Sequence, residues 1–312
     1  MDWSKLLQLT VDGTTLGCVY ALVALGYSMV YGLLKLLNFA HGDVYMIGAF
    51  IGYFVFTALG GPLTPSVSLV ALFLVMLVAA AVGCGLLGIA IERFAYRPLR
   101  YAPRIAPLIT ALGVSFLLEN SALLVFGAEY RSYNTYELDN GRLFTTGIHL
   151  DGVIISLMRI IVIAAAALMM VCLVLFVRYT RAGKASRAVA FDREAAEMMG
   201  IDIDRVITII FFVGSALAGI SGVMFGLIFQ NVYSYMGFEA GLIGFAAAVI
   251  GGIGSIQGAM FGGLFIGLIE SFVDGYAPQG STFQDLYLFF VLVAVMLLRP
   301  TGFLGKADIK RA

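Results

Sequence analysis

Long apolar runs constrain the fold of this chain more than any other feature of its sequence. They lie at about 12–34, 38–58, 66–92, 107–126, 153–177, 206–230, 240–274 and 285–299. A helix needs about 20 apolar residues to cross a bilayer, and backbone groups in lipid must bond within the chain. Because 61% of the residues are apolar and only 12% charged, a soluble fold is excluded. We expect an all-α membrane protein.

The run 240–274 is too long for one crossing and contains a cluster of glycines, so we expect a Gly-rich hairpin or a broken, re-entrant pair of half-helices there. The chain then forms a single transmembrane domain over 1–312, a polytopic helical bundle of about 8–9 crossings built on two related halves. Glycines at helical i, i+4 spacing predict closely packed helices. Examples of this spacing are Gly13 and Gly17, Gly48 and Gly52, Gly222 and Gly226, and Gly263 and Gly267.

Basic residues predict the orientation of the spans. Of the 19 Lys and Arg residues, 14 fall in three segments, one after the third run, one after the fifth and one at the C-terminus. By the positive-inside rule these segments face the cytoplasm. We therefore expect a multi-pass protein of the cell inner (plasma) membrane with a cytoplasmic loop at 178–205, an external loop at 127–152 and a cytoplasmic C-terminus.

The cytoplasmic loop contains signals for a short helix over about 193–199. Asp192 is a good N-cap, Glu194 sits where the helix dipole favours an anion, and Gly200 suits the position after the C-terminus. Its small and adaptable side chains, between basic flanks, suit a groove on a partner protein. These side chains belong to Ala195, Ala196, Met198 and Met199. The alternative is an amphipathic connector that lies on anionic lipid.

A polar motif opens the second apolar run, with Asn38, His41, Gly42 and Asp43 within six residues. Polar groups at membrane depth are costly and face protein or a water-filled cavity. The motif could form a half-helix N-terminus that favours a substrate carboxylate. Alternatively, Asn38 caps the helix while His41 and Asp43 bond to neighbouring backbone.

The Gly-rich hairpin is the second candidate for the translocation pathway. Its glycines let backbone approach the pathway closely, and its late position loosely mirrors the turn at 35–48. The residues concerned are Gly251, Gly252, Gly254 and Gly258.

Three blocks of sequence, in order over nearly the whole chain, resemble the branched-chain amino acid permease family of ABC importers. The blocks are 20–26 with 38–43, then Arg187, Ala195, Ala196 and Gly200 with 204–206, then 245–258 with 299–302. The resemblance is to the shorter, first permease subunit of the high-affinity leucine, isoleucine and valine importer. Lys184 stands where the family usually has arginine, and Gln257 where it usually has proline, which loosens the turn expected in the hairpin.

The resemblance implies a permease that works with a second homologous permease subunit, two cytoplasmic ABC ATPases and an extracytoplasmic substrate-binding protein. It also implies that the segment docking on an ATPase comprises Arg187, Asp192, Glu194, Ala195, Ala196, Met198, Met199 and Gly200. The sequence has no phosphate-binding Gly-x-x-x-x-Gly-Lys-Ser/Thr motif, so energy must come from a partner. We expect no enzymatic activity, no cofactor, no metal and no nucleic-acid partner.

Three other functions stay open. Importers of urea or short amides resemble this family, an ion-coupled secondary transporter is a different mechanism, and a passive channel is the third alternative. After Asp43, Glu119 and Glu270 are the other acids placed well within the runs, and hydrogen-bonded packing or pairing with a second permease is favoured over a proton relay because both are isolated. Glu92, at a cytoplasmic helix end, is expected to be solvated.

Overall fold

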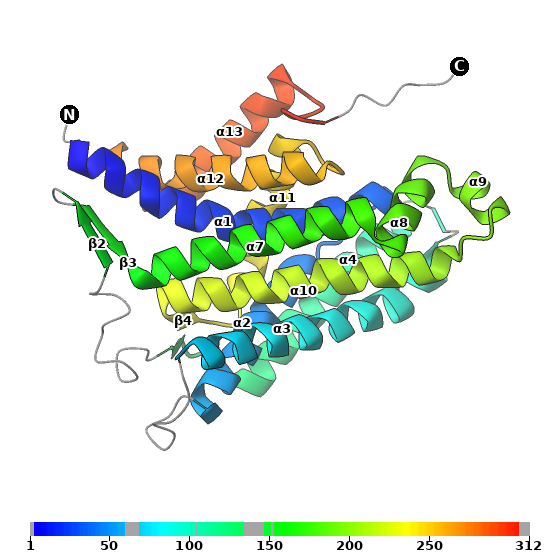
Figure 1. Cartoon of the computed structure of the whole chain (residues 1–312), viewed down its shortest axis with the longest axis horizontal. Coiled ribbons are helices and arrows are strands. Elements are labelled where there is room, and N and C mark those ends of the chain that lie inside the picture. The colour runs from blue at the N-terminus through cyan, green and yellow to red at the C-terminus, as the bar shows by residue number, and fades with distance from the viewer. Residues whose placement is uncertain are drawn as a thin grey trace.

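The computed structural model describes residues 3–59, 69–100, 102–103, 105–133, 147–150 and 153–305. Most of these residues are helical (Figure 1). The α-helices are α1 (Trp3–Leu34), α2 (His41–Leu59), α3 (Leu69–Ile91), α4 (Ile105–Phe126), α7 (Leu157–Tyr179), α8 (Arg181–Phe191), α9 (Arg193–Met198), α10 (Ile203–Phe229), α11 (Met236–Gly251), α12 (Ile256–Tyr276) and α13 (Gln284–Leu298). A π-helical turn, η1 (Glu92–Tyr96), and a 3-10 turn, η2 (Arg97–Leu99), extend α3.

The predicted all-α membrane bundle is confirmed. Within the described residues, seven helices are long and apolar enough to cross a membrane, and α11 and α13 are shorter apolar helices. The run 240–274 is interrupted, because α11 ends before residues 252–255 and α12 begins after them; whether the two helices form a hairpin or half-helices in the membrane stays a prediction. The number of crossings and the relation between two halves stay predictions.

Two small antiparallel sheets lie at the end of the bundle opposite α8 and α9 (Figure 1). β1 (Arg131–Ser132) pairs with β4 (Asn231–Val232), and β2 (Gly147–Leu150) pairs with β3 (Val153–Ser156). The prediction that a membrane helix starts at 153 is therefore wrong by four residues. Ser156 ends the strand and caps α7, because its hydroxyl accepts a hydrogen bond from the Arg159 N–H at 3.4 Å. Residues 134–146 and 151–152 of the predicted external loop lie outside the described residues.

Helix α1 is the central element of the bundle and packs against α12, α10 and α11. It is buried along most of its length, and in Figure 1 it runs between α12 and the α7–α10 layer. The predicted close packing through glycine is confirmed at two helix pairs. A Cβ on Gly17 would lie 2.8 Å from the Leu264 Cα of α12, and one on Gly48 would lie 2.3 Å from the Gly219 Cα of α10. Such contacts stabilise helix pairs in lipid, where the hydrophobic effect between helices is absent.

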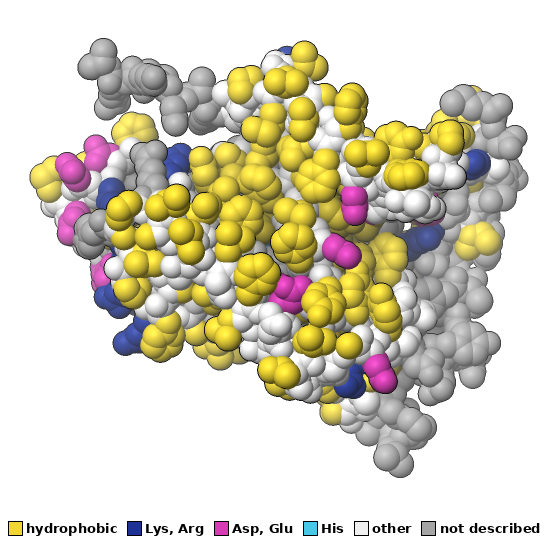
Figure 2. Space-filling view, turned by 180° about the vertical axis from the view of Figure 1, so that it is seen from behind, with side chains coloured by type: hydrophobic (Ala, Val, Ile, Leu, Met, Phe, Trp, Pro, Cys, Tyr) yellow, Lys and Arg dark blue, Asp and Glu magenta, His cyan; other side chains and the backbone are white. Residues whose placement is uncertain are grey.

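The outer helices present apolar side chains to the surroundings. On α4, Ile109, Leu117 and Leu124 are 60%, 64% and 86% exposed. Figure 2 shows a largely apolar face with a few acidic side chains among the apolar ones, whereas both basic and acidic side chains gather at the end that carries α8 and α9. This distribution is that of a protein whose sides contact lipid or another membrane subunit.

Candidate functional site

The segment between α7 and α10 forms two short helices joined at a single residue. Asp192 caps α9 as predicted, because its carboxylate accepts a hydrogen bond from the Ala195 N–H at 3.0 Å. Gly200 has a φ of +79°, the left-handed conformation that follows many helix ends. The predicted helix over 193–199 is therefore confirmed to within one residue as α9.

Helix α8 was missed at the sequence level, although its signals are present. Thr180 caps it by accepting a hydrogen bond from the Gly183 N–H at 3.0 Å. Gly183, Ser186 and Val189 recur every three residues and are buried, while the basic side chains of Lys184 and Arg187 are exposed. The buried residues are small and partly polar, so hydropathy alone does not mark this face.

The two helices expose a set of large apolar side chains next to basic ones. Phe191, Met198 and Met199 are 80%, 83% and 82% exposed, and Arg187 and Glu194 are also exposed. We call residues 181–200, which comprise α8, Asp192, α9, Met199 and Gly200, the foot.

Ala196 differs from the expectation that it faces a partner. It is 4% exposed, because its side of α9 packs against the chain itself, and its carbonyl accepts a hydrogen bond from the Ile201 N–H. Ala195 is half-buried. The outward surface of the foot is thus made by the methionines rather than by the alanines.

A cavity of about 80 Å³ lies where the foot meets the bundle. It brings together Arg187 of α8, Ser28 and Gly32 of α1, Ile210 of α10 and Gly254 of the hairpin. Two regions that the sequence marks separately, the cytoplasmic segment and the Gly-rich hairpin, are therefore neighbours. The sequence holds no signal for this, because the contact depends on how α1 crosses between them.

The hairpin between α11 and α12 needs glycine for its shape. Gly252 and Gly254 have φ values of +113° and +86°, and a Cβ on Gly251 would lie 1.8 Å from the Gly258 carbonyl oxygen. Residues near the C-terminus also contact this turn, since the Leu304 N–H donates a hydrogen bond to the Gly251 carbonyl oxygen at 2.9 Å. The turn thus packs between the foot and the C-terminal segment.

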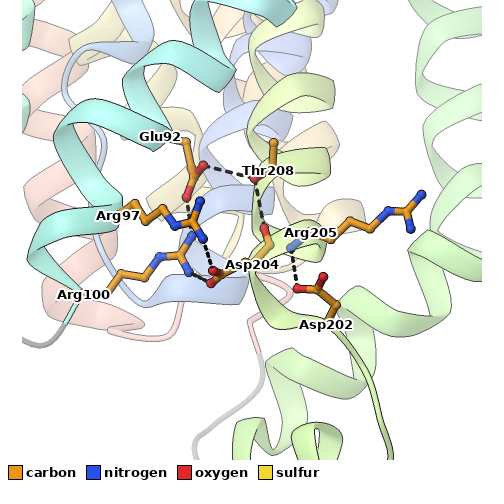
Figure 3. Close-up of polar contacts among 7 residues, drawn as sticks. All are labelled: Glu92, Arg97, Arg100, Asp202, Asp204, Arg205 and Thr208. Carbon is orange, nitrogen blue, oxygen red and sulfur yellow. Dashed lines mark hydrogen bonds and ion pairs between the residues drawn. The ribbon is translucent and has the colours of Figure 1, made fainter.

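An ion-pair network ties α3 to the start of α10 beside the foot (Figure 3). Arg100 donates to both Glu92 and Asp204, and Arg97 donates to Asp204. The Thr208 hydroxyl donates to the second oxygen of Glu92 at 3.1 Å. Arg205 points away from the network in Figure 3.

The expectation that Glu92 is solvated is therefore wrong. The residue is 1% exposed, because the π-helical turn and the 3-10 turn after α3 bring Arg100 back over it. Burial of this carboxylate is tolerated because a guanidinium and a hydroxyl satisfy it.

The polar motif at the start of α2 lies inside the bundle. Asn38, His41 and Asp43 are 2%, 1% and 1% exposed. The Asn38 side chain accepts a hydrogen bond from the Tyr96 hydroxyl at 3.0 Å. The N-terminus of α2 packs against the middle of two long helices, α1 and α10. The His41 ring lies on Gly26 of α1, next to Gly214 of α10.

The start of α2 also packs closely on α11. A Cβ on Gly42 would lie 2.2 Å from the Gly237 carbonyl oxygen and 2.6 Å from the Gly241 Cα. The Asp43 carboxylate is buried here, and the Ser115 side chain of α4 lies within hydrogen-bonding reach of it. The helix start thus places a buried acid at the junction of α2, α4 and α11.

A larger cavity, of about 310 Å³, lies nearer the other end of the bundle and was not predicted. Glu270 lines it and accepts hydrogen bonds from Tyr20 at 3.2 Å and from Gln284, so the predicted hydrogen-bonded packing of this acid is confirmed. Tyr233 donates to Glu239 on its rim at 2.5 Å. Burial, and then this hydrogen bond, raise the pKa of the Tyr233 phenol, so the phenol stays a neutral donor. Within the described ranges, no three His, Cys, Asp or Glu side chains gather as metal ligands.

Comparison with known proteins places these features in a family. The family model for the permease component of branched-chain amino acid transport systems matches residues 9–298. The high-affinity branched-chain amino acid transport system permease protein BraD of Pseudomonas aeruginosa is 40% identical over 305 residues, which are 98% of this chain and 97% of that protein. The protein LivH of Escherichia coli, of the same description, is 39% identical over 307 residues, with coverage of 98% and 97%. The chain therefore belongs to the family of permease components of branched-chain amino acid transport systems.

Proposed function

We propose that this chain is the transmembrane permease subunit of an ABC importer for branched-chain amino acids. The observation that carries the proposal is the family match over residues 9–298, together with relatives of about 40% identity that are named as such permeases. In this proposal, two separate ATPases supply energy, a second homologous permease completes the pathway, and an extracytoplasmic binding protein delivers the substrate.

The foot is the proposed contact with an ATPase. Its exposed Phe191, Met198 and Met199 offer flexible apolar surface, and its basic side chains surround that surface. The cap at Asp192 and the turn at Gly200 hold α9 at a defined angle. The positive-inside rule supports a cytoplasmic position for the foot and the C-terminus.

Force applied to the foot would pass into the bundle by two routes. The first is covalent, because α7 and α10 flank the foot in the chain. The second is packing, because Arg187 shares a cavity with α1 and with the hairpin at Gly254. Helices packed this closely shift as units rather than deforming smoothly, so ATP-driven closure of the ATPases would tilt α1, α7 and α10 together.

The proposed translocation pathway follows the start of α2 and the Gly-rich hairpin. The two sites lie along α1, at Gly26 and at Gly32 respectively. Asn38, His41 and Asp43 at the start of α2 are buried polar groups at a depth where polar groups are costly. Opening between α2, α4 and α11 would expose them to a passing zwitterion.

Reconstitution tests this function. The chain is inserted into liposomes with its second permease and ATPases, and the binding protein is added outside. We expect ATP-dependent accumulation of radiolabelled leucine, isoleucine and valine, and loss of accumulation when the ATPases carry a catalytically dead mutation. Uptake of urea in place of leucine, uptake that persists with dead ATPases and follows an ion gradient, or equilibration without accumulation would each contradict the proposal.

A further inference from the structure

The larger cavity combines acids and aromatic rings at the end of the bundle away from the foot. Glu239, Glu270 and Asp285 line it, and so do Tyr20, Tyr45 and Tyr233. These residues come from α1, α2, α11, α12, α13 and the segment before α11. Among the described residues that line the cavity, none is Lys or Arg. Its charge therefore favours a cationic group over an anionic one.

Within the part of the chain that the structure describes, two buried polar atoms on residues that line this cavity have no hydrogen-bond partner. Glu270 is 7% exposed, and both of its hydrogen bonds, from Tyr20 and Gln284, go to Oε1, which leaves Oε2 without a donor. The hydroxyl of Tyr45 is also unpartnered, and this residue is 1% exposed. Buried polar atoms in native proteins are almost always paired, so an unpaired oxygen on a carboxylate that lines the cavity favours a donor from outside the chain once the side chain turns towards the cavity.

Another part of the wall is apolar, and Ser281, Thr282 and Gln284 add neutral polar groups. Phe225 of α10 with Met236 and Ile243 of α11 face the same space as the acids. A volume of about 310 Å³ is at the lower end of the range for small-molecule pockets. The cavity thus suits a small ligand that has a cationic donor group on one side and a short hydrocarbon chain on the other.

We propose that this cavity binds the ammonium group and the aliphatic side chain of an amino acid during its passage, with Glu270 as the main acceptor. An ammonium carries three donors, which the Glu270 carboxylate, the Tyr45 hydroxyl and one of the rim carboxylates would accept after Glu270 and Tyr45, whose unpaired oxygens are buried, turn towards the cavity. Tyrosine faces add attraction for a cation. The inference rests on the proposed function, because it identifies where the transported amino acid binds within this chain.

Direct binding tests the proposal without the binding protein. The assembled importer is placed in nanodiscs, and saturable binding of radiolabelled leucine is measured, with two competitors that each lack one end of the molecule. We expect 3-methylbutylamine, which keeps the ammonium, to compete, and 4-methylpentanoate, which lacks it, to have no effect. Glu270→Gln keeps the size and the Tyr20 contact, and it should weaken leucine binding about tenfold or more. Tyr45→Phe should weaken it by a smaller factor.

Controls separate this inference from the function on which it rests. Glu129→Gln changes an exposed acid near the same end of the bundle and should leave leucine affinity unchanged. The inference alone is overturned if the unmodified importer accumulates leucine but the Glu270→Gln variant binds leucine normally. It is also overturned if 4-methylpentanoate competes for leucine binding as well as the amine does. If Glu270→Gln prevents assembly with the second permease, the carboxylate pairs with that subunit instead, which also overturns it. Failure of the unmodified importer to transport leucine counts against the proposed function.

Discussion

Replacing Arg100 with methionine removes the guanidinium that satisfies Glu92 while keeping a long side chain. The side chains of Arg100 and Glu92 are 6% and 2% exposed, so neither water nor another cation replaces the lost charge. Removing one partner of a buried ion pair costs about 3–5 kcal/mol, since the other charge stays buried. We expect Arg100→Met to lower the free energy of unfolding by an amount in this range.

The same network offers a matched control in Arg97→Met. Arg97 and Asp204 form an ion pair whose side chains are 49% and 46% exposed, and Asp204 keeps Arg100 when Arg97 is lost. Exposed pairs contribute about 0–1 kcal/mol, so this substitution should cost several-fold less. Adding Glu92→Gln to Arg100→Met removes the buried charge and keeps an acceptor for Thr208. The double variant should recover most of the lost stability.

The free energy of unfolding can be measured in mixed micelles by raising the fraction of denaturing detergent while following helix content by circular dichroism. Refolding on dilution establishes reversibility. If Arg100→Met costs no more than Arg97→Met, or if the double variant is as unstable as Arg100→Met alone, then burial of Glu92 does not determine the strength of this network.

Three further predictions concern backbone geometry. Gly200→Val forces a β-branched residue to a φ of +79°, at a cost of about 1–2 kcal/mol. The variant should couple ATP hydrolysis to uptake less well, while its membrane insertion stays normal. Unchanged uptake per ATP in liposomes contradicts this. Asp192→Ala removes the cap of α9, costs about 1 kcal/mol, and should speed amide hydrogen exchange in α9 while α7 exchanges as before. Gly42→Ala places a Cβ 2.2 Å from the Gly237 oxygen and should lower the thermal midpoint, whereas Gly113→Ala, with nothing within 4 Å, should leave or raise it; equal shifts contradict the reasoning.

The membrane helices and the limits of α9 could be predicted because both depend on local chemistry. Hydrophobic length decides which segments span, and the cap at Asp192 and the glycine at position 200 act within one turn of the helix they bound. Helix α8 shows the limit of this approach. Its buried face consists of Gly183, Ser186 and Val189, which hydropathy does not distinguish from a loop.

The contacts between distant segments could not be predicted in the same way. Glu92 is solvated or buried depending on whether Arg100 folds back and Thr208 of α10 lies opposite, 116 residues away in the chain. Likewise, Glu270 joins Tyr20, which is 250 residues away, only because α12 packs antiparallel along α1. A single sequence does not specify which helix faces pack against each other.

The sequence by itself determined that this chain is a helical membrane protein with a small, basic, capped segment between two spans, because length, hydropathy and capping are properties of neighbouring residues. Only the tertiary structure decided that Arg187 meets the Gly-rich hairpin, that Ala196 faces inward, and that Glu270 lines a cavity. The physical reason is that helix packing in lipid depends on close steric fit between whole surfaces, and such a fit exists only when the helices are assembled.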